Sequence, residues 1–597
     1  MNVPATRSPT APTAAAAALD GGVRALRRAY EAGLDPVDVV EEVAARIAAA
    51  DDPAVWIDVE PLEALRAAAT ELRGRPLDDL PLYGVPFGVK DNIDVAGRMT
   101  TAALPGAAYV AGRDATVVRR LFDAGALYVG KTNLDQLATG LVGTRSPYGT
   151  PRNPLDDRLV PGGSSSGSAV AVARRQVAFA LGTDTAGSGR VPAALCGIVG
   201  LKPAPGARPL DGVVPASPTI DCVSSFATSV GDGLAVEAVA GARPWALATG
   251  PFTVATTAAG EARHAGSAGH GGDARDATRL LADAGHRIVP VDLAPFHEAG
   301  DLLYAGPWLA DRTAALSPLL DGDPEGVDDT VRTVVAGGHR HRGTDVFAAQ
   351  ARLRAIARAL AAWWEEVDVL VVPTVDHLPT RHAIAAEPVE GNARLGRNTT
   401  FANMLGLAAI AVPARPDASG APRPGGVTVL GPPAHAGAVA AVAAELCGEA
   451  LPAGHDAAGG RTQVAVVGAH LRGQPLNGQL TDRGAELVAT TTTAARYRLH
   501  LLDGGPPLRP GLERVDDGDG AAIEVEVWTL DAAALGAFTA AVPPPLGIGS
   551  VELADGRWVK GFICEPLGLR TATDITRHGG WRAFLATAPA GQRPKAE

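Results

Sequence analysis

Two loops rich in serine and glycine constrain this chain more than any other feature of its sequence. The first is PGGSSSGSAVAVA (161–173) and the second is LGTDTAGSGRVPAA (181–194), and each runs into a helix-like apolar stretch. Small residues in such loops let backbone N–H groups face a reacting atom. A phosphate-binding loop would end in Gly-Lys-Ser or Gly-Lys-Thr, and neither loop contains lysine. Together with GVPFGVKDNIDVAG (84–97) upstream, the two loops indicate a site for chemistry at serine.

The sequence around these loops, from about residue 80 to 230, predicts an α/β fold. Leu127–Val129 and Val177–Leu181 are short, continuous apolar runs of the kind found in buried strands. They alternate with glycine-rich turns and with helix-like stretches such as Ala115–Ala124. Hydrophobic residues make up 46% of the chain and charged residues 20%, which excludes a disordered protein. We therefore expect a mostly buried sheet with helices packed on it.

Glycine content and periodicity divide the chain into four parts. The start has a short alanine run without the apolar strength of a signal peptide, and we expect it to be a disordered lead-in. The glycine-rich break LPAGHDAAGGRTQ, at 451–463, indicates a domain boundary. The segment after this break contains strand-like stretches such as Ala522–Leu530 and is long enough to fold alone. The predicted parts are a lead-in at 1–19, a large domain at 20–452, a linker at 453–462 and a second domain at 463–597.

Net charge, hydropathy and cysteine content restrict the kinds of partner that the protein can bind and the cellular compartment in which we expect it. The net charge of −12 argues against a nucleic-acid backbone as a partner. No run of roughly 20 strongly apolar residues is present, so we expect no membrane span. The four cysteines form no CxxC pair and favour a reduced, cytoplasmic location. We predict no metal site.

The three segments quoted above resemble the amidase signature family, over most of the chain before the glycine-rich break. The resemblance implies a mixed central sheet covered by helices, and a catalytic group of two serines and a lysine. Carried onto this sequence, the nucleophile is Ser188 in TAGSGR, the bridging serine is Ser164 in GGSSSG, and the lysine is Lys90 in FGVKDN. The family usually has glycine where this chain has Ser166, and that change moves neither catalytic serine.

The chemistry of these residue types agrees with the implied roles. A serine hydroxyl is a weak nucleophile that needs an adjacent base. Lys90 can be that base only when it is neutral, so we expect burial to lower its pKa. Ser164 would relay the proton between Lys90 and Ser188. Asp91, the neighbour of the lysine, must then point away and bond to the backbone.

The loop that carries the nucleophile predicts two further features. Asp184 and Arg190 are expected to form a buried ion pair that supports the loop rather than to act in catalysis. Backbone amides would stabilise the negative charge of a tetrahedral intermediate. The predicted donors of this oxyanion hole are the amides of Thr185, Ala186, Gly187 and Ser188.

Four further segments resemble the allophanate hydrolases within this family. They are ATGLVGTRSPYGTPRNP (138–154), PASPTIDCVSSFATSV (215–230), LLYAGPWLADR (302–312) and VAVVGAHLRGQPLN (464–477). The resemblance then covers nearly the whole chain. It implies serine-dependent hydrolysis of allophanate with release of ammonia, followed by decarboxylation, in urea catabolism. It also implies that no cofactor is needed.

The same resemblance places a tyrosine and an arginine on the substrate, at Tyr304 and Arg312. From the residues alone, a core aromatic and a charge on a helix surface would be the better interpretation. The second domain is similar to γ-glutamyl cyclotransferase-like domains, with an expected α+β fold. His470 is the candidate there, since histidine can hold a proton near neutral pH. A structural histidine in a strand-to-loop turn is kept as the alternative.

Other functions remain open at this point. One is a general short-chain amidase or carbamoyl hydrolase, and another is an A-type amidotransferase subunit that works with transfer RNA. The acidic charge and the appended domain count against the amidotransferase. A non-catalytic scaffold is disfavoured because Lys90, Ser164 and Ser188 are all present. A homodimer and a functional link with urea carboxylase are compatible with the resemblance.

Overall fold

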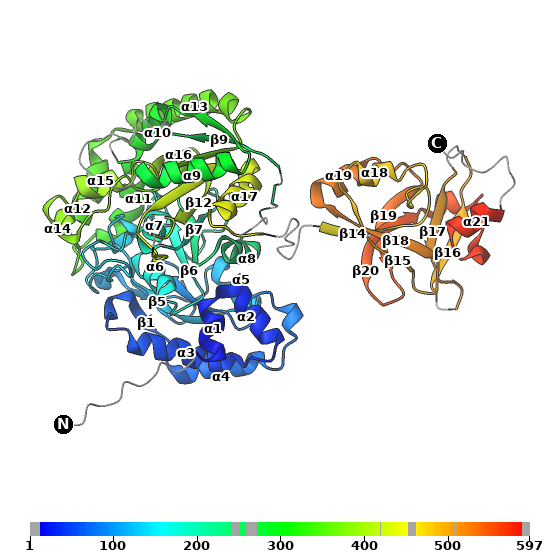
Figure 1. Cartoon of the computed structure of the whole chain (residues 1–597), viewed down its shortest axis with the longest axis horizontal. Coiled ribbons are helices and arrows are strands. Elements are labelled where there is room, and N and C mark those ends of the chain that lie inside the picture. Colours follow the sequence, from blue (N-terminus) through cyan, green and yellow to red (C-terminus); the bar gives the residue numbers. More distant parts are fainter. Residues whose placement is uncertain are drawn as a thin grey trace. The chain divides into compact units, whose positions relative to one another are not determined.

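The chain folds into two compact units, Met1–Ala457 and Ala458–Glu597 (Figure 1). The computed structural model describes residues 12–241, 245, 247–248, 250–257, 271–304, 306–417, 419–451, 461–504, 508–516 and 518–587. The division between the units falls inside the predicted linker, of which residues 453–460 lie outside the described residues. The last two residues of that predicted linker already belong to a strand, β14 (Arg461–Val466).

A large mixed sheet forms the centre of the first unit, as predicted. Within the described residues it has 11 strands, in the order β1-β5-β2-β6-β8-β7-β12-β13-β11-β9-β10. The pairs β2–β5 and β2–β6 are parallel, whereas β6–β8 and β12–β13 are antiparallel. The strands are β1 (Trp56–Val59), β2 (Pro86–Lys90), β5 (Leu127–Thr132), β6 (Phe179–Asp184), β7 (Val199–Lys202), β8 (Cys222–Ala227), β9 (Thr253–Thr256), β10 (Arg287–Pro290), β11 (Val369–Pro373), β12 (Ala408–Pro413) and β13 (Gly426–Gly431).

Helices cover both faces of this sheet (Figure 1). Along β11, Val369 and Val371 pack in one hydrophobic cluster, and Leu370 and Val372 pack in another. This alternation is the period of a strand that is buried on both sides. A short hairpin of β3 (Met99–Thr100) and β4 (Tyr109–Val110) lies apart from the sheet. The helices are α1 (Ala14–Asp20), α2 (Gly22–Glu31), α3 (Pro36–Ala49), α4 (Leu62–Leu72), α5 (Thr116–Asp123), α6 (Ser166–Ala173), α7 (Val191–Cys196), α8 (Val230–Ala240), α9 (Gly271–Asp283), α10 (Ala294–Tyr304), α11 (Leu309–Leu320), α12 (Asp329–Ala336), α13 (Gly343–Trp364), α14 (Arg381–Ala386), α15 (Glu390–Leu395), α16 (Thr400–Met404) and α17 (Ala436–Leu446).

Helix α1 corrects the prediction of a disordered lead-in over 1–19. Residues 1–11 lie outside the described residues, but the alanine run from residue 14 is helical. Thr13 caps the helix by accepting a hydrogen bond from the Ala16 amide. Leu19 is fully buried in the same cluster as Val40 of α3. Alanine is weak as a hydrophobic signal but is the best helix former, and its small side chain allows close packing.

The order of the strands positions the predicted site. β2 and β6 are parallel neighbours, and they end at Lys90 and Asp184 respectively. Their carboxyl ends therefore meet at one edge of the sheet, which is where ligands bind in open α/β sheets. The chain segment with Ser188 leaves β6 at this edge and leads into α7.

The second unit has a smaller sheet with few helices, as predicted for an α+β domain. Val464 and Val466 of β14 and Val525 and Val527 of β18 are fully buried in its core. Among the described residues, one sheet has the order β15-β18-β14-β20-β19 and another has the order β17-β16-β21. The further elements are β15 (Glu486–Thr492), β16 (Tyr497–Leu501), β17 (Pro510–Arg514), β18 (Glu524–Asp531), β19 (Leu546–Glu552), β20 (Trp558–Cys564), β21 (Thr573–Asp574), α18 (Gly478–Thr481), α19 (Ala532–Ala540), α20 (Pro566–Leu569) and α21 (Trp581–Thr587).

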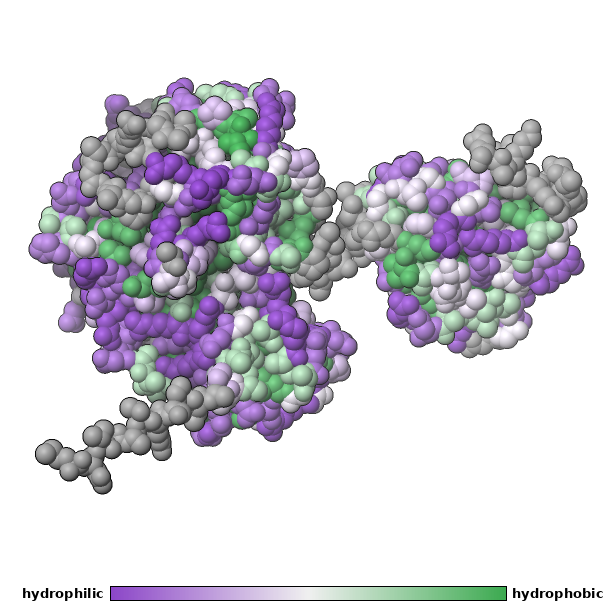
Figure 2. All heavy atoms as spheres, viewed as in Figure 1, coloured by the Kyte–Doolittle hydropathy of each residue, from purple (hydrophilic) through white to green (hydrophobic). Residues whose placement is uncertain are grey.

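The visible surface of both units is a mosaic of hydrophilic and hydrophobic residues (Figure 2). Within the described part of the chain, no helix has the length and apolar character needed to cross a bilayer.

Candidate active site

The three residues predicted for catalysis lie together in one hydrogen-bonded row. Lys90 Nζ is 2.8 Å from Ser164 Oγ, and Ser164 Oγ is 3.0 Å from Ser188 Oγ. The peptide bond between Gly163 and Ser164 is cis. All three side chains are buried, with Ser188 retaining 3% exposure. Hydroxyl protons can rotate between neighbours, so this row can pass a proton from Ser188 to Lys90.

The environment of Lys90 lowers its pKa to about 7. Burial is the largest cause, because the charged ammonium loses its water. The carboxylates of Asp135, Asp184 and Asp221 act in the opposite direction, and the positive charge of Arg312 lowers the pKa further. A large share of the lysine is therefore neutral near neutral pH, as a general base requires.

Asp91 points away from Lys90, which confirms the prediction. Its carboxylate accepts a hydrogen bond from the Thr101 amide at 3.0 Å and lies 3.1 Å from Lys131 Nζ. Lys131 also donates to the Ile93 carbonyl at 2.7 Å. The adjacent carboxylate is thus paired with a different lysine.

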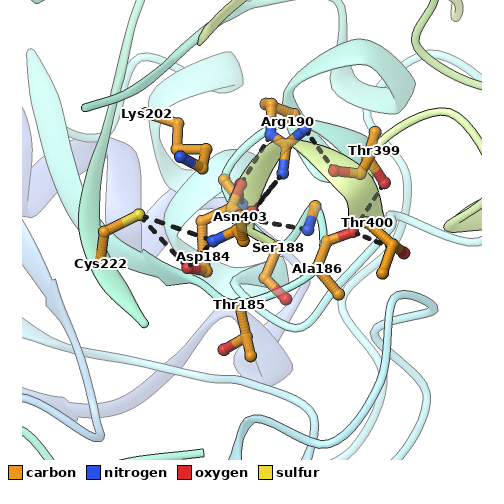
Figure 3. A network of polar contacts seen from close by, with 12 residues as sticks. Asp184, Thr185, Ala186, Ser188, Arg190, Lys202, Cys222, Thr399, Thr400 and Asn403 are labelled. Atoms are coloured by element: carbon orange, nitrogen blue, oxygen red, sulfur yellow. Dashed lines mark hydrogen bonds and ion pairs between the residues drawn. The ribbon is translucent and has the colours of Figure 1, made fainter. Parts of the chain in front are cut away.

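Asp184 and Arg190 form the predicted buried ion pair beneath the nucleophile loop (Figure 3). Arg190 Nε and Nη2 each lie 2.9 Å from a carboxylate oxygen of Asp184. Burial alone would raise the pKa of Asp184, but Arg190 and the Gly189 amide hold it below its usual value. Figure 3 shows the Ser188 hydroxyl directed away from this pair. The pair supports the loop that carries Ser188 and makes no contact with its hydroxyl.

Residues from far along the chain complete this support. Arg190 Nη1 donates to the Thr399 carbonyl at 2.8 Å, and Arg190 Nη2 donates to Asn403 Oδ1 at the same distance. The Asn403 amide donates in turn to the Asp184 carbonyl at 2.8 Å. Thr399 Oγ1 donates to the Ala186 carbonyl at 2.7 Å. The loop is therefore held on both sides by α16 and the residue before it (Figure 3).

The structure corrects one residue of the predicted oxyanion hole. The Gly187 amide donates to Asp184 Oδ1 at 2.8 Å, so it cannot face a substrate oxygen. The backbone at Gly187 has φ +133°, and a Cβ there would meet Thr399 Oγ1 at 2.3 Å, so only glycine fits. In the part of the chain that the structure describes, the amides of Thr185, Ala186 and Ser188 donate to no protein acceptor. These three remain the candidate donors.

Removing the buried carboxylate should be costly for stability. We expect Asp184→Ala to lower the free energy of unfolding by about 3–5 kcal/mol, because it leaves Arg190 buried without a counter-charge. The matched control is Asp276→Ala, which breaks an exposed ion pair with Arg279 on α9. That loss should stay below about 1 kcal/mol. Urea unfolding measures both, and equal losses would contradict the structural role of the Asp184–Arg190 pair.

Tyr304 and Arg312 lie close together, and their surroundings fit the binding of an anion. Tyr304 is the last residue of α10, and Arg312 lies in the first turn of α11. The Arg312 guanidinium carbon lies 5.6 Å from the centre of the Tyr304 ring. Arg312 is fully buried and donates from Nη1 to Thr139 Oγ1 at 2.7 Å. Its Nε and Nη2 have no partner among the described residues. A buried cation with open donors can hold a carboxylate by two parallel hydrogen bonds.

Some residues of the site were not predicted from the sequence. Thr183 Oγ1 accepts a second hydrogen bond from Lys90, at 2.7 Å, and lies inside one of the serine-glycine segments. Asp221 accepts from Thr185 Oγ1 at 2.5 Å and from the Ser217 amide at 2.9 Å. Thr183 could have been found by its motif. Asn403 and Thr399 give no local signal, because only the fold brings them to the loop.

His470 lies in the second unit, in surroundings that favour packing. Its ring stacks on Phe562 at 5.0 Å and meets Phe538 edge-on at 5.1 Å. Nε2 lies 3.1 Å from Gln479 Oε1. Burial lowers the pKa of His470. Within the described residues, no group of three or more His, Cys, Asp or Glu side chains could hold a metal ion.

Family models match each of the two units separately. The amidase family model matches residues 38–439, and the model of the allophanate hydrolase C-terminal domain matches residues 462–586. The structure of selenomethionine-substituted Kluyveromyces lactis allophanate hydrolase is 37% identical, with a TM-score of 0.70. That alignment covers 95% of this chain and 99% of the other.

Two curated relatives are similar to this chain over different shares of its length. Urea amidolyase of Saccharomyces cerevisiae is 40% identical over 570 residues, or 89% of this chain. Those residues make up 31% of the yeast protein, so this chain spans about a third of it. Mandelamide hydrolase of Pseudomonas putida is 31% identical over 63% of this chain and 81% of its own length. The chain belongs to the amidase family, and its second unit matches the allophanate hydrolase C-terminal domain.

Proposed function

We propose that this protein hydrolyses allophanate, with Ser188 as nucleophile, Ser164 as proton relay and Lys90 as base. The observation that carries the proposal is the buried Arg312, whose Nε and Nη2 are open and whose charge acts on Lys90. Allophanate is small, planar and anionic, with a carboxylate at one end and a carboxamide at the other. The site offers a matching pair of features, a cation for the first end and a nucleophile for the second.

The proposed first step is acyl transfer to serine. Ser188 Oγ attacks the carboxamide carbon while its proton passes through Ser164 to neutral Lys90. The amides of Thr185, Ala186 and Ser188 stabilise the oxyanion. The proton then moves to the leaving nitrogen, the C–N bond breaks and ammonia departs. Water hydrolyses the acyl-enzyme by the same relay and releases a dicarboxylated nitrogen compound.

That product loses carbon dioxide, so the complete reaction yields two ammonia and two carbon dioxide molecules. The second unit, which matches the allophanate hydrolase C-terminal domain, is the proposed place for assistance to decarboxylation. The ring contacts of the half-buried His470 with Phe538 and Phe562 support a packing role better than proton transfer.

The substrate end of the proposal rests on Arg312 and Tyr304. The planar guanidinium can hold a carboxylate with two parallel hydrogen bonds. The Tyr304 hydroxyl can bond to another polar edge of the substrate. A general short-chain amidase, for which the similarity to mandelamide hydrolase is the supporting observation, would not need a buried cation.

The proposal predicts that charge decides substrate choice. Biuret is the matched neutral substrate, because it carries a carboxamide where allophanate carries its carboxylate. Arg312→Lys should lower kcat/KM for allophanate by about 10- to 100-fold, since it keeps charge but loses the fork. The value for biuret should change less than about threefold, because biuret offers no carboxylate. The measurement is ammonia release from allophanate, biuret, malonamate and simple amides.

Two outcomes would contradict this function. Wild-type enzyme that prefers biuret or simple amides to allophanate would indicate a general amidase. Equal losses for the charged and the neutral substrate in Arg312→Lys would indicate a structural arginine.

We also propose a functional link with urea carboxylase, the reaction class that would supply allophanate from urea. The support is the similarity to urea amidolyase, of which this chain spans about a third. A homodimer stays a prediction, as does a cytoplasmic location.

A further inference from the structure

We propose that Thr139 is a positioning residue that holds Arg312 with its Nε–Nη2 edge open toward the substrate carboxylate. This inference rests on the proposed function and adds a residue that determines substrate specificity. Thr139 does not touch the reacting atoms, and it acts through the guanidinium.

Of the three guanidinium nitrogens of Arg312, one has a hydrogen-bond partner among the described residues and two have none. Nη1 donates to Thr139 Oγ1 at 2.7 Å, whereas Nε and Nη2 have no partner among the described residues. The ring of Tyr304 lies against the guanidinium at 5.6 Å. The plane is thus supported by an aromatic face, and the rotation within that plane is set by the single bond to Thr139.

The geometry of a guanidinium gives this single bond its importance. The Nε–H bond and one N–H bond of Nη2 are parallel and lie on the same edge, which matches the two oxygens of a carboxylate. Nη1 lies on the other side of the group. A partner that occupies Nη1 alone therefore leaves the complete two-pronged edge available.

The hydroxyl of Thr139 is oriented to accept. Thr139 Oγ1 donates its own proton to the Leu137 carbonyl at 3.1 Å, so its lone pairs are free to accept from Arg312. Both side chains are buried, Thr139 with 1% exposure and Arg312 with none. Water cannot readily replace the hydroxyl as acceptor in such a place.

The backbone around Thr139 is fixed from several directions. Its amide donates to the Gln136 carbonyl at 3.0 Å, and its carbonyl accepts from Arg145 Nη1 at 2.9 Å. Leu137 and Ala138 both have positive φ, 52° and 51°, which non-glycine residues adopt only when their surroundings impose it. The loop therefore presents the hydroxyl at a defined point, and the guanidinium takes its orientation from it.

The test compares two substrates in three variants at buried threonines. Thr139→Val keeps the side-chain shape and removes the acceptor, and Thr139→Ser restores it. Thr313→Val is the matched control, because Thr313 is the neighbour of Arg312 on α11 and its hydroxyl bonds to the Leu309 and Val335 carbonyls instead. KM and kcat are measured for allophanate and for biuret, alongside wild type and Arg312→Lys.

We expect Thr139→Val to raise KM for allophanate about tenfold with kcat within about threefold of wild type, because one hydrogen bond to a charged group is lost. KM for biuret should stay within about twofold, and Thr139→Ser should return KM for allophanate to near the wild-type value. Thr313→Val should leave the allophanate-to-biuret preference unchanged. If Thr139→Val does not fold, Thr139→Ala removes the same acceptor and gives the same comparison.

Equal losses for both substrates in Thr139→Val, or an unchanged preference, would overturn the inference. If Arg312→Lys abolishes the preference while Thr139→Val keeps it, this inference fails and the proposed function survives. If wild type shows no preference for allophanate, both fail together.

Discussion

Ser188→Ala is expected to lower the turnover of allophanate by about 10³-fold or more. The substitution removes the atom that forms the acyl-enzyme, and only substrate binding and oxyanion stabilisation remain. The rest of the site should persist, because Asp184, Arg190 and Asn403 hold the loop through contacts that do not involve the Ser188 hydroxyl. The measurement is single-turnover ammonia release.

The first control is a measurement of whether Ser188→Ala keeps the stability of wild type. Its free energy of unfolding in urea should match that of wild type within about 1 kcal/mol, since one small hydroxyl is removed from a single hydrogen bond. Ser166→Ala offers a matched comparison, because that buried hydroxyl, on the first residue of α6, has no partner among the described residues. Ser166→Ala should keep near-normal turnover. A Ser188→Ala enzyme with more than a tenth of wild-type turnover would reject Ser188 as the nucleophile.

Lys90→Met should reduce turnover nearly as much as Ser188→Ala, by roughly 10³-fold. Methionine fills similar space without an amine, so the fully buried position stays packed. Because both residues serve one proton relay, the double variant should be no slower than Ser188→Ala alone. Multiplicative losses would contradict a shared relay.

The pH profile of wild type is a second measure of the same residue. The pKa of Lys90 is lowered to about 7, so the neutral form that accepts a proton prevails above this pH. The value of kcat/KM should fall about tenfold per pH unit below pH 7 and level off above it. If the residual kcat/KM of Lys90→Met still falls below pH 7, the decrease is caused by the titration of another group.

The grouping of Ser164, Ser188 and Lys90 could be predicted from the sequence because they lie in short segments that resemble the amidase signature family. Ser164 and Ser188 occur in glycine-rich loops, and Lys90 ends an apolar strand. The fold class followed from the alternation of buried strands and helices. The direction of Asp91 could also be predicted, because a neutral lysine excludes a carboxylate partner.

The remaining features depend on contacts between distant segments. No local pattern brings Thr139 to Arg312 or Asn403 to Arg190, since the loops meet only in the folded sheet. The Gly187 amide looked suitable as an oxyanion donor, but the carboxylate that takes it follows from three-dimensional geometry. The helix of Ala14–Asp20 was missed because hydrophobicity underrates alanine.

The strand order has a consequence for how the chain matures during synthesis. β12 and β13 lie between β7 and β11, although they are the last strands of the sheet to be made. Until β12 and β13 pair with them, β7 and β11 each have an unpaired edge, and the two parts of the sheet are not joined. The residues that hold the nucleophile loop, Thr399 and Asn403, are also translated late. A nascent chain that ends before residue 403 therefore contains the whole relay in sequence but lacks the support that gives it working geometry. We therefore expect activity only once the first unit is nearly complete.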